Sequence, residues 1–505
     1  MWTLSHSSSP EPQSAGVGDS HAAERSHRAL MLRGRVFVIF AAAAVVASLW
    51  ALLAASVAFG RPNIVVVMTD DQDVASLRVM KDTQRLIGRH GVRFVNSYVT
   101  TPLCCPSRAT FHTGRYVHNH RVLSSNPPEG AAAGFSRKVR PSQTLAVRLR
   151  RAGYRTGYVG KYLNEPRSDG DFNVPRGWNK WFEPTLGTTY RMYDFVLNAN
   201  GRAQSYGDSA HDFQTDVLAR KALRFLSSSA RRRKPFFLML GTVAPHTTDS
   251  SSNVQNPLAA PRHRTRFDHT PLRRSPSFNE RDVSDKPPLM RRPPMGKGKK
   301  RRFRALYRSR LESLLAVDDA VERIMHRLRR TGERQDTVVI FTSDNGFLLG
   351  EHRLRGKELA YEESAAVPLL MRGPGISRGA RRTQVVGNVD LAPTILDLAG
   401  GRRGRMDGRS LLPFIRNPDI APRRDLLIEV LVSGRARPFK AIRSANYLLV
   451  NHRGPASELY DLASDPFQLT NRYKDPAYRG IRRKLRSRLH LLAHCGRDRC
   501  RGRTD

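Results

Sequence analysis

Four apolar runs, each followed by polar residues, limit the possible folds of this chain more than any other feature. Continuous runs without polar alternation are typical of parallel strands that are buried on both faces. Segments with helical periodicity separate these runs, at residues 144–152, 212–226 and 303–330. The runs cover residues 63–68, 156–159, 235–240 and 337–342, followed respectively by Asp70-Asp71, Lys161, His246 and Asp344-Asn345.

Strands that alternate with helices predict an α/β fold, with a large mixed, mostly parallel sheet between helices. In such sheets, ligands bind at the carboxyl ends of the strands. We therefore expect the polar groups that follow the four runs to converge on one site.

The remaining segments predict a domain organisation around this sheet. We expect a catalytic domain at residues 61–417, interrupted at 247–302 by a basic, Pro-rich insertion that forms a partly flexible surface loop. Shorter strands at 426–432 and 447–450, followed by a basic helix, predict a small C-terminal α+β domain at residues 418–505.

The N-terminal region has the pattern of an export signal. Residues 1–35 are rich in Ser, His and Arg and are predicted to be a disordered basic segment. Residues 36–59 form an apolar run after this basic flank, and small residues at its end suit cleavage after Ala58. The run is also long enough for an uncleaved signal anchor. Either alternative places the folded part outside the cytoplasm, secreted or membrane-anchored.

The chain has 86 Lys and Arg against 44 Asp and Glu, which gives a formal net charge of +42. Three explanations are open: nucleic-acid binding, attraction of other polyanions, or an Arg bias without a specific partner. The arginines are spread along the chain, and no zinc-finger spacing, RNP-like motif or basic-region heptad is present. We therefore expect no nucleic-acid partner.

The four cysteines form two pairs. Cys495 and Cys500 are separated by a short loop, which in an exported protein predicts a disulfide, although free thiols and a zinc half-site remain alternatives. Cys104 and Cys105 are adjacent, and a disulfide across one peptide bond is strained. The adjacent Cys104 and Cys105 therefore need another explanation.

That explanation comes from Cys104-Cys105-Pro106-Ser107-Arg108 and the following Thr113-Gly114-Arg115. Here the chain resembles the formylglycine-dependent sulfatase family of the alkaline-phosphatase-like superfamily, whose modification motif is Cys-x-Pro-Ser-Arg. The resemblance extends from about Pro62 to Asn471. It implies that a formylglycine-generating enzyme oxidises Cys104 to formylglycine, and that the hydrated aldehyde is the nucleophile.

Oxygen ligands for a metal ion follow two of the predicted strands. Asp70, Asp71, Asp344 and Asn345 carry the hard oxygen atoms that a divalent cation prefers. The family resemblance implies that they hold one Ca²⁺ ion together with the modified side chain of Cys104.

The resemblance also implies a set of basic side chains that bind the negatively charged sulfate ester. Arg108 lies one helical turn after Cys104 and would hold the nucleophile and the metal-site carboxylates. Lys161 and Lys357 would bind sulfate oxygens. His246 would bind sulfate or protonate the leaving oxygen.

One position departs from the family pattern. Many sulfatases carry a histidine two residues after the lysine that corresponds to Lys161, whereas this chain has Leu163, followed by Asn164. The same Lys-Tyr-Leu-Asn run is found in the N-acetylglucosamine-6-sulfatase and extracellular glucosaminyl-6-sulfatase branch, which implies a sulfated amino-sugar substrate. The identity of the base is open, and Asn164 is a candidate for part of that role.

Two other functions are kept as alternatives. Relatives with the same motif cleave phosphorus esters, so a phosphodiesterase or phosphonate monoester hydrolase is the first. The +42 charge makes a non-catalytic polyanion-binding surface protein the second.

Overall fold

The structure is a computed structural model, in which residues 61–505 form one compact unit. It describes residues 60–165, 172–232, 234–249, 254–417, 419–420, 425–433, 438–452 and 456–501. The predicted N-terminal segments at 1–35 and 36–59 lie outside these residues. Across the described ranges, no helix combines the length and the apolar character needed to cross a membrane.

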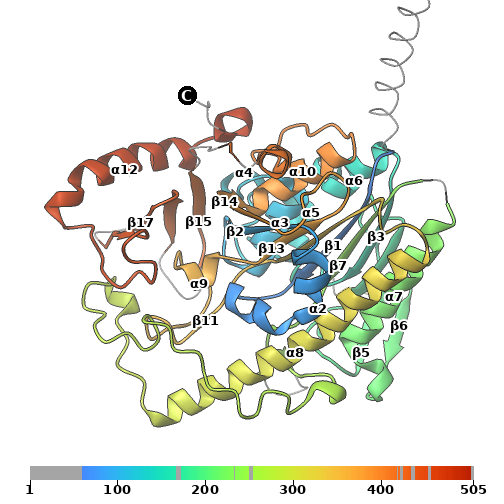
Figure 1. Ribbon diagram of the computed structural model, residues 1–505, viewed down its shortest axis with the longest axis horizontal. Helices are drawn as coiled ribbons and strands as arrows, with labels where there is room; N and C mark the ends of the chain where they lie inside the picture. Colours follow the sequence, from blue (N-terminus) through green and yellow to red (C-terminus); the bar gives the residue numbers. More distant parts are fainter. Residues whose placement is uncertain are drawn as a thin grey trace, which may run out of the picture. The chain divides into compact units, whose positions relative to one another are not determined.

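A ten-stranded mixed sheet forms the centre of the unit (Figure 1), which confirms the predicted fold class. The strands β10, β1, β7, β3 and β4 are mutually parallel, and antiparallel pairs extend the sheet on both sides. In spatial order the strands are β14 Ala380–Gly387, β2 Val92–Tyr98, β13 Leu369–Arg372, β10 Thr337–Ser343, β1 Asn63–Thr69, β7 Phe236–Gly241, β3 Arg155–Gly160, β4 Lys180–Pro184, β5 Phe195–Ala199 and β6 Ala203–Tyr206.

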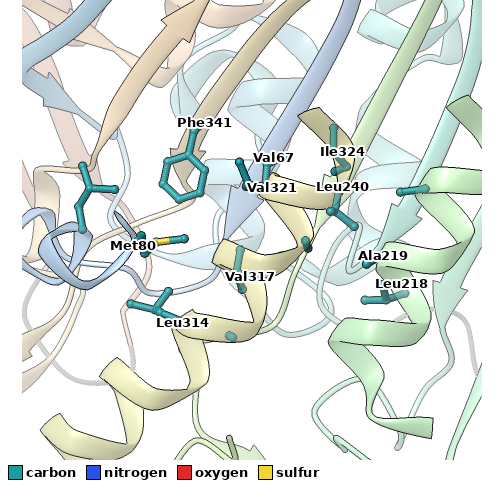
Figure 2. Packing of buried hydrophobic residues seen from close by; sticks show 14 of the residues in the cluster. Val67, Met80, Leu218, Ala219, Leu240, Leu314, Val317, Val321, Ile324 and Phe341 are labelled. Atoms are coloured by element: carbon teal, nitrogen blue, oxygen red, sulfur yellow. The ribbon is translucent and has the colours of Figure 1, made fainter. Parts of the chain in front are cut away.

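The central strands are mostly apolar because both faces of the sheet are covered. Val65 and Val67 of β1 contact one hydrophobic cluster with α7 Gln214–Ala230 and α8 Lys297–Arg330. Figure 2 shows how the α8 side chains lie over this face of the sheet. Ile64 and Val66 point into a second cluster on the other face, with α3 Cys104–Thr113 and α10 Leu391–Leu398. Successive side chains of a strand alternate between faces, so a strand buried on both sides has no alternation of apolar and polar residues.

The other α-helices are short. Together they cover the second face of the sheet, join its strands and form the C-terminal region. They are α2 Lys81–Thr83, α3 Cys104–Thr113, α4 Val117–His120, α5 Ala131–Lys138, α6 Leu145–Arg151, α9 Glu362–Ala365, α10 Leu391–Leu398, α11 Leu412–Arg416 and α12 Arg479–Ala493.

The predicted insertion at residues 247–302 differs from the structure in two respects. Helix α8 already begins at Lys297, directly after Gly296, because Lys and Arg are good helix formers and the last proline of the insertion is Pro294. The insertion is also more than a surface loop. Ser277, Glu280 and Lys286 are buried, and the Lys286 Nζ donates to the Glu280 carboxylate at 3.0 Å.

A second, four-stranded antiparallel sheet carries the C-terminal region. Its hydrophobic core includes side chains of α12 and also residues of the central sheet, such as Tyr98 of β2 and Val385 of β14. The predicted domain boundary between residues 417 and 418 therefore stays a prediction. Cys495 and Cys500 form a disulfide after α12, as predicted. The strands are β15 Leu426–Val430, β16 Phe439–Arg443, β17 Tyr447–His452 and β18 Glu458–Asp461.

Candidate active site

The carboxyl ends of four neighbouring parallel strands meet at one edge of the central sheet. These strands, β10, β1, β7 and β3, are the four apolar runs of the sequence. Their register places Thr69 beside Ser343 and Gly160 beside Gly241. The polar groups that follow them therefore lie close together, as the alternation of strands and helices predicts.

The acidic part of the site is completely buried. Asp70, Asp71, Asp344 and Asn345 are each exposed by 2% or less. The Asp71 backbone N–H donates to Asp344 Oδ1 at 3.0 Å, and Asn345 Nδ2 donates to Asp71 Oδ1 at 2.7 Å. Asp71 has a φ of 68°, in the left-handed region that Asp tolerates better than most residues. The chain reverses sharply there, which brings two consecutive carboxylates to the same site.

This group of side chains fits a hard divalent cation. Four potential ligand atoms lie within 4.8 Å of one another, one each from Asp70, Asp71, Cys104 and His246. Asn345 Oδ1 is buried and has no hydrogen-bond partner among the described residues, so it remains available as a ligand. Carboxylate and amide oxygens are the ligands that Ca²⁺ and Mg²⁺ prefer.

Burial and neighbouring charges act against each other on these carboxyl groups. Burial favours the neutral acid of Asp70, but Lys161, His246 and Arg108 outweigh it and lower its pKa. The pKa of Asp71 is lowered for the same reason, mainly by Lys357. Burial and the negative charge of Asp70 raise the pKa of Asp344 to about 6.

Cys104 is the first residue of helix α3 and faces this acidic group. Its Sγ lies 3.2 Å from Asp70 Oδ1 and 3.7 Å from Asp71 Oδ1. Pro106 occupies the first turn of α3, where a missing N–H is tolerated, and Gly114 ends the helix with a φ of 64°. The positive end of the helix dipole thus lies at Cys104 and favours negative charge there. Burial, reinforced by Asp70, raises the pKa of the Cys104 thiol.

Arg108 joins the nucleophile helix to two of the strand ends. Its Nε donates to Asp344 Oδ2 at 2.7 Å, and its Nη2 lies 3.6 Å from Asp70 Oδ2. Nη1 donates to the Lys161 carbonyl at 2.5 Å. The guanidinium is fully buried, so these contacts fix the relative positions of α3, β1, β3 and β10.

Lys161 reaches the site because β3 and β7 approach very closely at their ends. Gly160 has a φ of 102°, and a Cβ there would lie 1.9 Å from the Gly241 carbonyl oxygen. Only glycine permits this approach, in which the Lys161 N–H donates to Gly241 O at 2.9 Å. The ammonium of Lys161 then donates to Asp70 Oδ2.

Lys357 and His246 complete the predicted set and both lie beside Asp71. Lys357 Nζ contacts Asp71 Oδ1 and lies 2.7 Å from Cys104 Sγ. His246 Nε2 lies 3.7 Å from Asp71 Oδ2, while its Nδ1 contacts the Thr247 carbonyl at 2.7 Å. Burial lowers the pKa of His246 despite the nearby carboxylates. The structure thus brings all of the predicted site residues together.

Two further side chains at this site were missed by the sequence analysis. The Tyr190 ring stacks on His246 at 4.5 Å, and Lys161 Nζ lies 4.8 Å from its centroid. Arg310 of α8 is buried and donates to the carbonyls of Asp71 and Pro245. Nothing in the sequence marks Tyr190, whereas Arg310 could have been found as a charge on the apolar stripe of α8.

Leu163, which occupies the position where many sulfatases carry a histidine, is a core residue in the structure. Leu163 is buried in the hydrophobic cluster on the α3 face of the sheet. Asn164 instead donates through Nδ2 to the Tyr190 hydroxyl at 2.8 Å, and its Oδ1 is buried without a hydrogen-bond partner among the described residues. Asn164 therefore orients the ring that covers His246 and Lys161.

Comparisons with known proteins identify the family of this chain. The family model described as sulfatase matches residues 62–401, and that described as N-sulphoglucosamine sulphohydrolase, C-terminal, matches residues 350–494. The N-acetylglucosamine-6-sulfatase of Homo sapiens is 35% identical over 489 residues, which cover 87% of this chain and 86% of that protein. An extracellular sulfatase SULF-1 homolog of Drosophila melanogaster is 37% identical over 75% of this chain and 33% of its own length.

Solved structures share the fold. The structure of BT4656 in complex with its substrate D-glucosamine-2-N,6-O-disulfate has a TM-score of 0.72 at 23% identity, covering 88% of this chain and 99% of that one. The phosphonate monoester hydrolase of Silicibacter pomeroyi has a TM-score of 0.62 at 21% identity, covering 86% and 96%. The match to the sulfatase model over most of the chain and the identity to the human relative show that this protein belongs to the sulfatase family.

Proposed function

We propose that this protein is an exported, calcium-dependent sulfatase that hydrolyses 6-O-sulfate esters of glucosamine residues in sulfated carbohydrate. One observation carries the proposal: four basic side chains and three carboxylates surround a single cysteine at the amino end of a helix. The names of the human and Drosophila relatives support the substrate class and the extracellular location.

In this proposal a formylglycine-generating enzyme converts Cys104 to formylglycine. The hydrated aldehyde supplies one hydroxyl for attack on sulfur and a second whose deprotonation allows sulfate to leave. Asp70, Asp71, Asp344 and Asn345 would hold one Ca²⁺ ion, which neutralises charge on the sulfate oxygens.

The other side chains have roles that follow from their positions. Lys357 Nζ lies 2.7 Å from Cys104 Sγ, and Lys161 donates to Asp70, which contacts the same sulfur. Both lysines would therefore bind sulfate oxygens where charge develops in the transition state. His246 lies beside Asp71 at the same site, where it would bind sulfate or, in its protonated form, donate a proton to the leaving alcohol oxygen. Arg108 acts through its contacts with Asp344 and the Lys161 carbonyl, and holds the nucleophile in line with the metal ligands.

The proposal is tested on protein co-expressed with a formylglycine-generating enzyme. Peptide mass spectrometry across residue 104 should find the aldehyde. Release of sulfate from N-acetylglucosamine 6-sulfate should require it, and Cys104→Ala should lower kcat by about 10⁴-fold or more. Cys105→Ala is the matched control, because Cys105 is buried in the hydrophobic cluster on the other side of α3.

Two outcomes would overturn the proposal. Full sulfatase activity in Cys104→Ala would exclude the proposed nucleophile. A higher kcat/KM on an aryl phosphate or phosphonate ester than on the matched aryl sulfate would favour the phosphorus-ester alternative, whose fold this chain shares.

A further inference from the structure

A strongly basic cavity lies directly beside the proposed nucleophile. It has a volume of about 400 Å³ and is lined by Arg292, Lys299, Arg355 and Lys357, with Leu289 and Leu354 among its apolar walls. Among the described residues that line it, none is acidic. Such a concentration of positive charge without a carboxylate is a binding site for an anion.

Lys357 connects this cavity to the site of the reaction. Its side chain lines the cavity, while its Nζ lies 2.7 Å from Cys104 Sγ and also contacts Asp71. A ligand that contacts Lys357 from the cavity therefore lies next to the proposed nucleophile. The cavity adds the basic side chains of Arg292 and Lys299 to that of Lys357.

The wall that carries Arg292 is held in place by one buried arginine. Arg353 is 8% exposed and donates to three carbonyls of the insertion: Nε to Glu280 at 2.8 Å, Nη1 to Arg292 at 2.7 Å and Nη2 to Arg281 at 2.7 Å. Charge-assisted hydrogen bonds of this kind are among the stronger ones in proteins. The insertion is therefore fixed against the 350–357 loop, and the cavity between them is preformed.

The lining also suits a sugar ring. Leu289 is 51% exposed, and Leu354 lines the same cavity. Apolar side chains can pack on the C–H face of a pyranose, while arginine binds a sulfate or carboxylate in a bidentate manner. The cavity thus offers an apolar surface and several anion-binding groups.

We propose that this cavity binds a second anionic group of the substrate, so that the enzyme prefers multiply charged carbohydrate to a monosulfated sugar. The proposal rests on the proposed function of the neighbouring site. The second anion is a sulfate or carboxylate, carried either by the same ring as the reacting sulfate or by the adjacent ring. Both sources present the same chemistry to Arg292 and Lys299.

The test compares kcat/KM on three substrates: N-acetylglucosamine 6-sulfate, glucosamine 2-N,6-O-disulfate, and 6-O-sulfated glucosamine linked to a sulfated uronic acid. We expect the formylglycine-containing enzyme to prefer one of the two multiply charged substrates. Arg292→Gln and Lys299→Gln should each lower this preference by about tenfold, the usual value of one charge-assisted hydrogen bond. Arg483→Gln is the matched control, because Arg483 is exposed on α12 and should leave all three rates unchanged.

Each outcome is decisive. Preference for the disulfate that is lost in the variants would place the second anion on the same ring, and preference for the disaccharide would place it on the adjacent ring. Equal kcat/KM on all three substrates, or a preference that survives both substitutions, would overturn the subsite while leaving the sulfatase function intact. Absence of sulfate release from every substrate would instead contradict the proposed function.

Discussion

Glu183 of β4 carries the clearest pH-dependent cost to stability in this fold. Its side chain is 8% exposed and lines a separate cavity of about 420 Å³, and its Oε1 has no hydrogen-bond partner among the described residues. Burial raises the pKa of Glu183 from its ordinary value of 4.5 to about 8, although hydrogen bonds from the backbone of Tyr162 and Leu163 oppose this. At neutral pH the folded protein therefore keeps this carboxyl group protonated.

The sign of the effect follows from linkage. A carboxyl group whose pKa is higher in the folded state contributes full stability below pH 4.5, and this contribution is lost as the pH rises toward 8. Each pH unit in this window lowers the free energy of unfolding by about 1.4 kcal/mol. The loss of stability is therefore about 1 kcal/mol at pH 5 and about 3 kcal/mol at pH 7. Glu183→Gln keeps an oxygen acceptor for the backbone and has no proton to lose. The difference in the free energy of unfolding between this variant and the wild type should therefore increase with pH.

Thermal unfolding of the wild type and of Glu183→Gln, recorded at half-unit steps between pH 5 and pH 8, measures this difference. The difference between the melting temperatures should be smallest at the acidic end and increase steadily toward the alkaline end, with the variant higher. Glu322→Gln, at an exposed position of α8, controls for the loss of one negative charge. Parallel pH profiles for the wild type and Glu183→Gln would refute the reasoning, because they would mean that Glu183 ionises as readily in the folded as in the unfolded chain.

Three further predictions concern the metal site, its support and the disulfide. Asp344→Asn removes one charged oxygen ligand and should weaken Ca²⁺ binding, measured by isothermal titration calorimetry, by about 100-fold; an unchanged affinity would exclude Asp344 as a ligand. Arg310→Met removes the donors to the Asp71 and Pro245 carbonyls and should cost about 3 kcal/mol in urea denaturation. A cost below about 1 kcal/mol would show that these contacts do not hold the loops. Cys495→Ser opens a short disulfide loop and should cost about 2 kcal/mol, a loss that dithiothreitol should reproduce in the wild type but not in the variant.

The strands at the centre of the sheet could be predicted almost to the residue. The run at 63–68 corresponds to β1 Asn63–Thr69, and the run at 337–342 corresponds to β10 Thr337–Ser343. Strands buried on both faces exclude polar residues, so their ends are marked by the first polar side chain. The edge strands lack an apolar run of this kind, so the sequence does not indicate where they begin and end. For example, β6 Ala203–Tyr206 has no buried residue and no apolar run.

The same difference explains which site residues could be located. Asp70, Lys161 and Asp344 directly follow buried strands, so the local sequence and the rule for parallel sheets together place them at one edge. Tyr190 lies between β4 and β5, and its position over His246 depends on how a long connection packs against the end of another strand. Such packing is determined by contacts between distant segments, which no local pattern records.

Arg310 is an intermediate case, because its sequence context contains a signal that could have predicted its place at the site. It occupies the stripe of α8 that also contains Leu314, Val317, Val321 and Ile324, and every one of these positions is buried. A charged side chain on an apolar stripe must find partners in the interior, because burying an unpaired charge is very costly. The loops at the ends of the buried strands offer such partners, in the carbonyls of Asp71 and Pro245. A charge that interrupts an otherwise apolar helix face therefore indicates polar partners in the interior, and for Arg310 these are the loops at the strand ends.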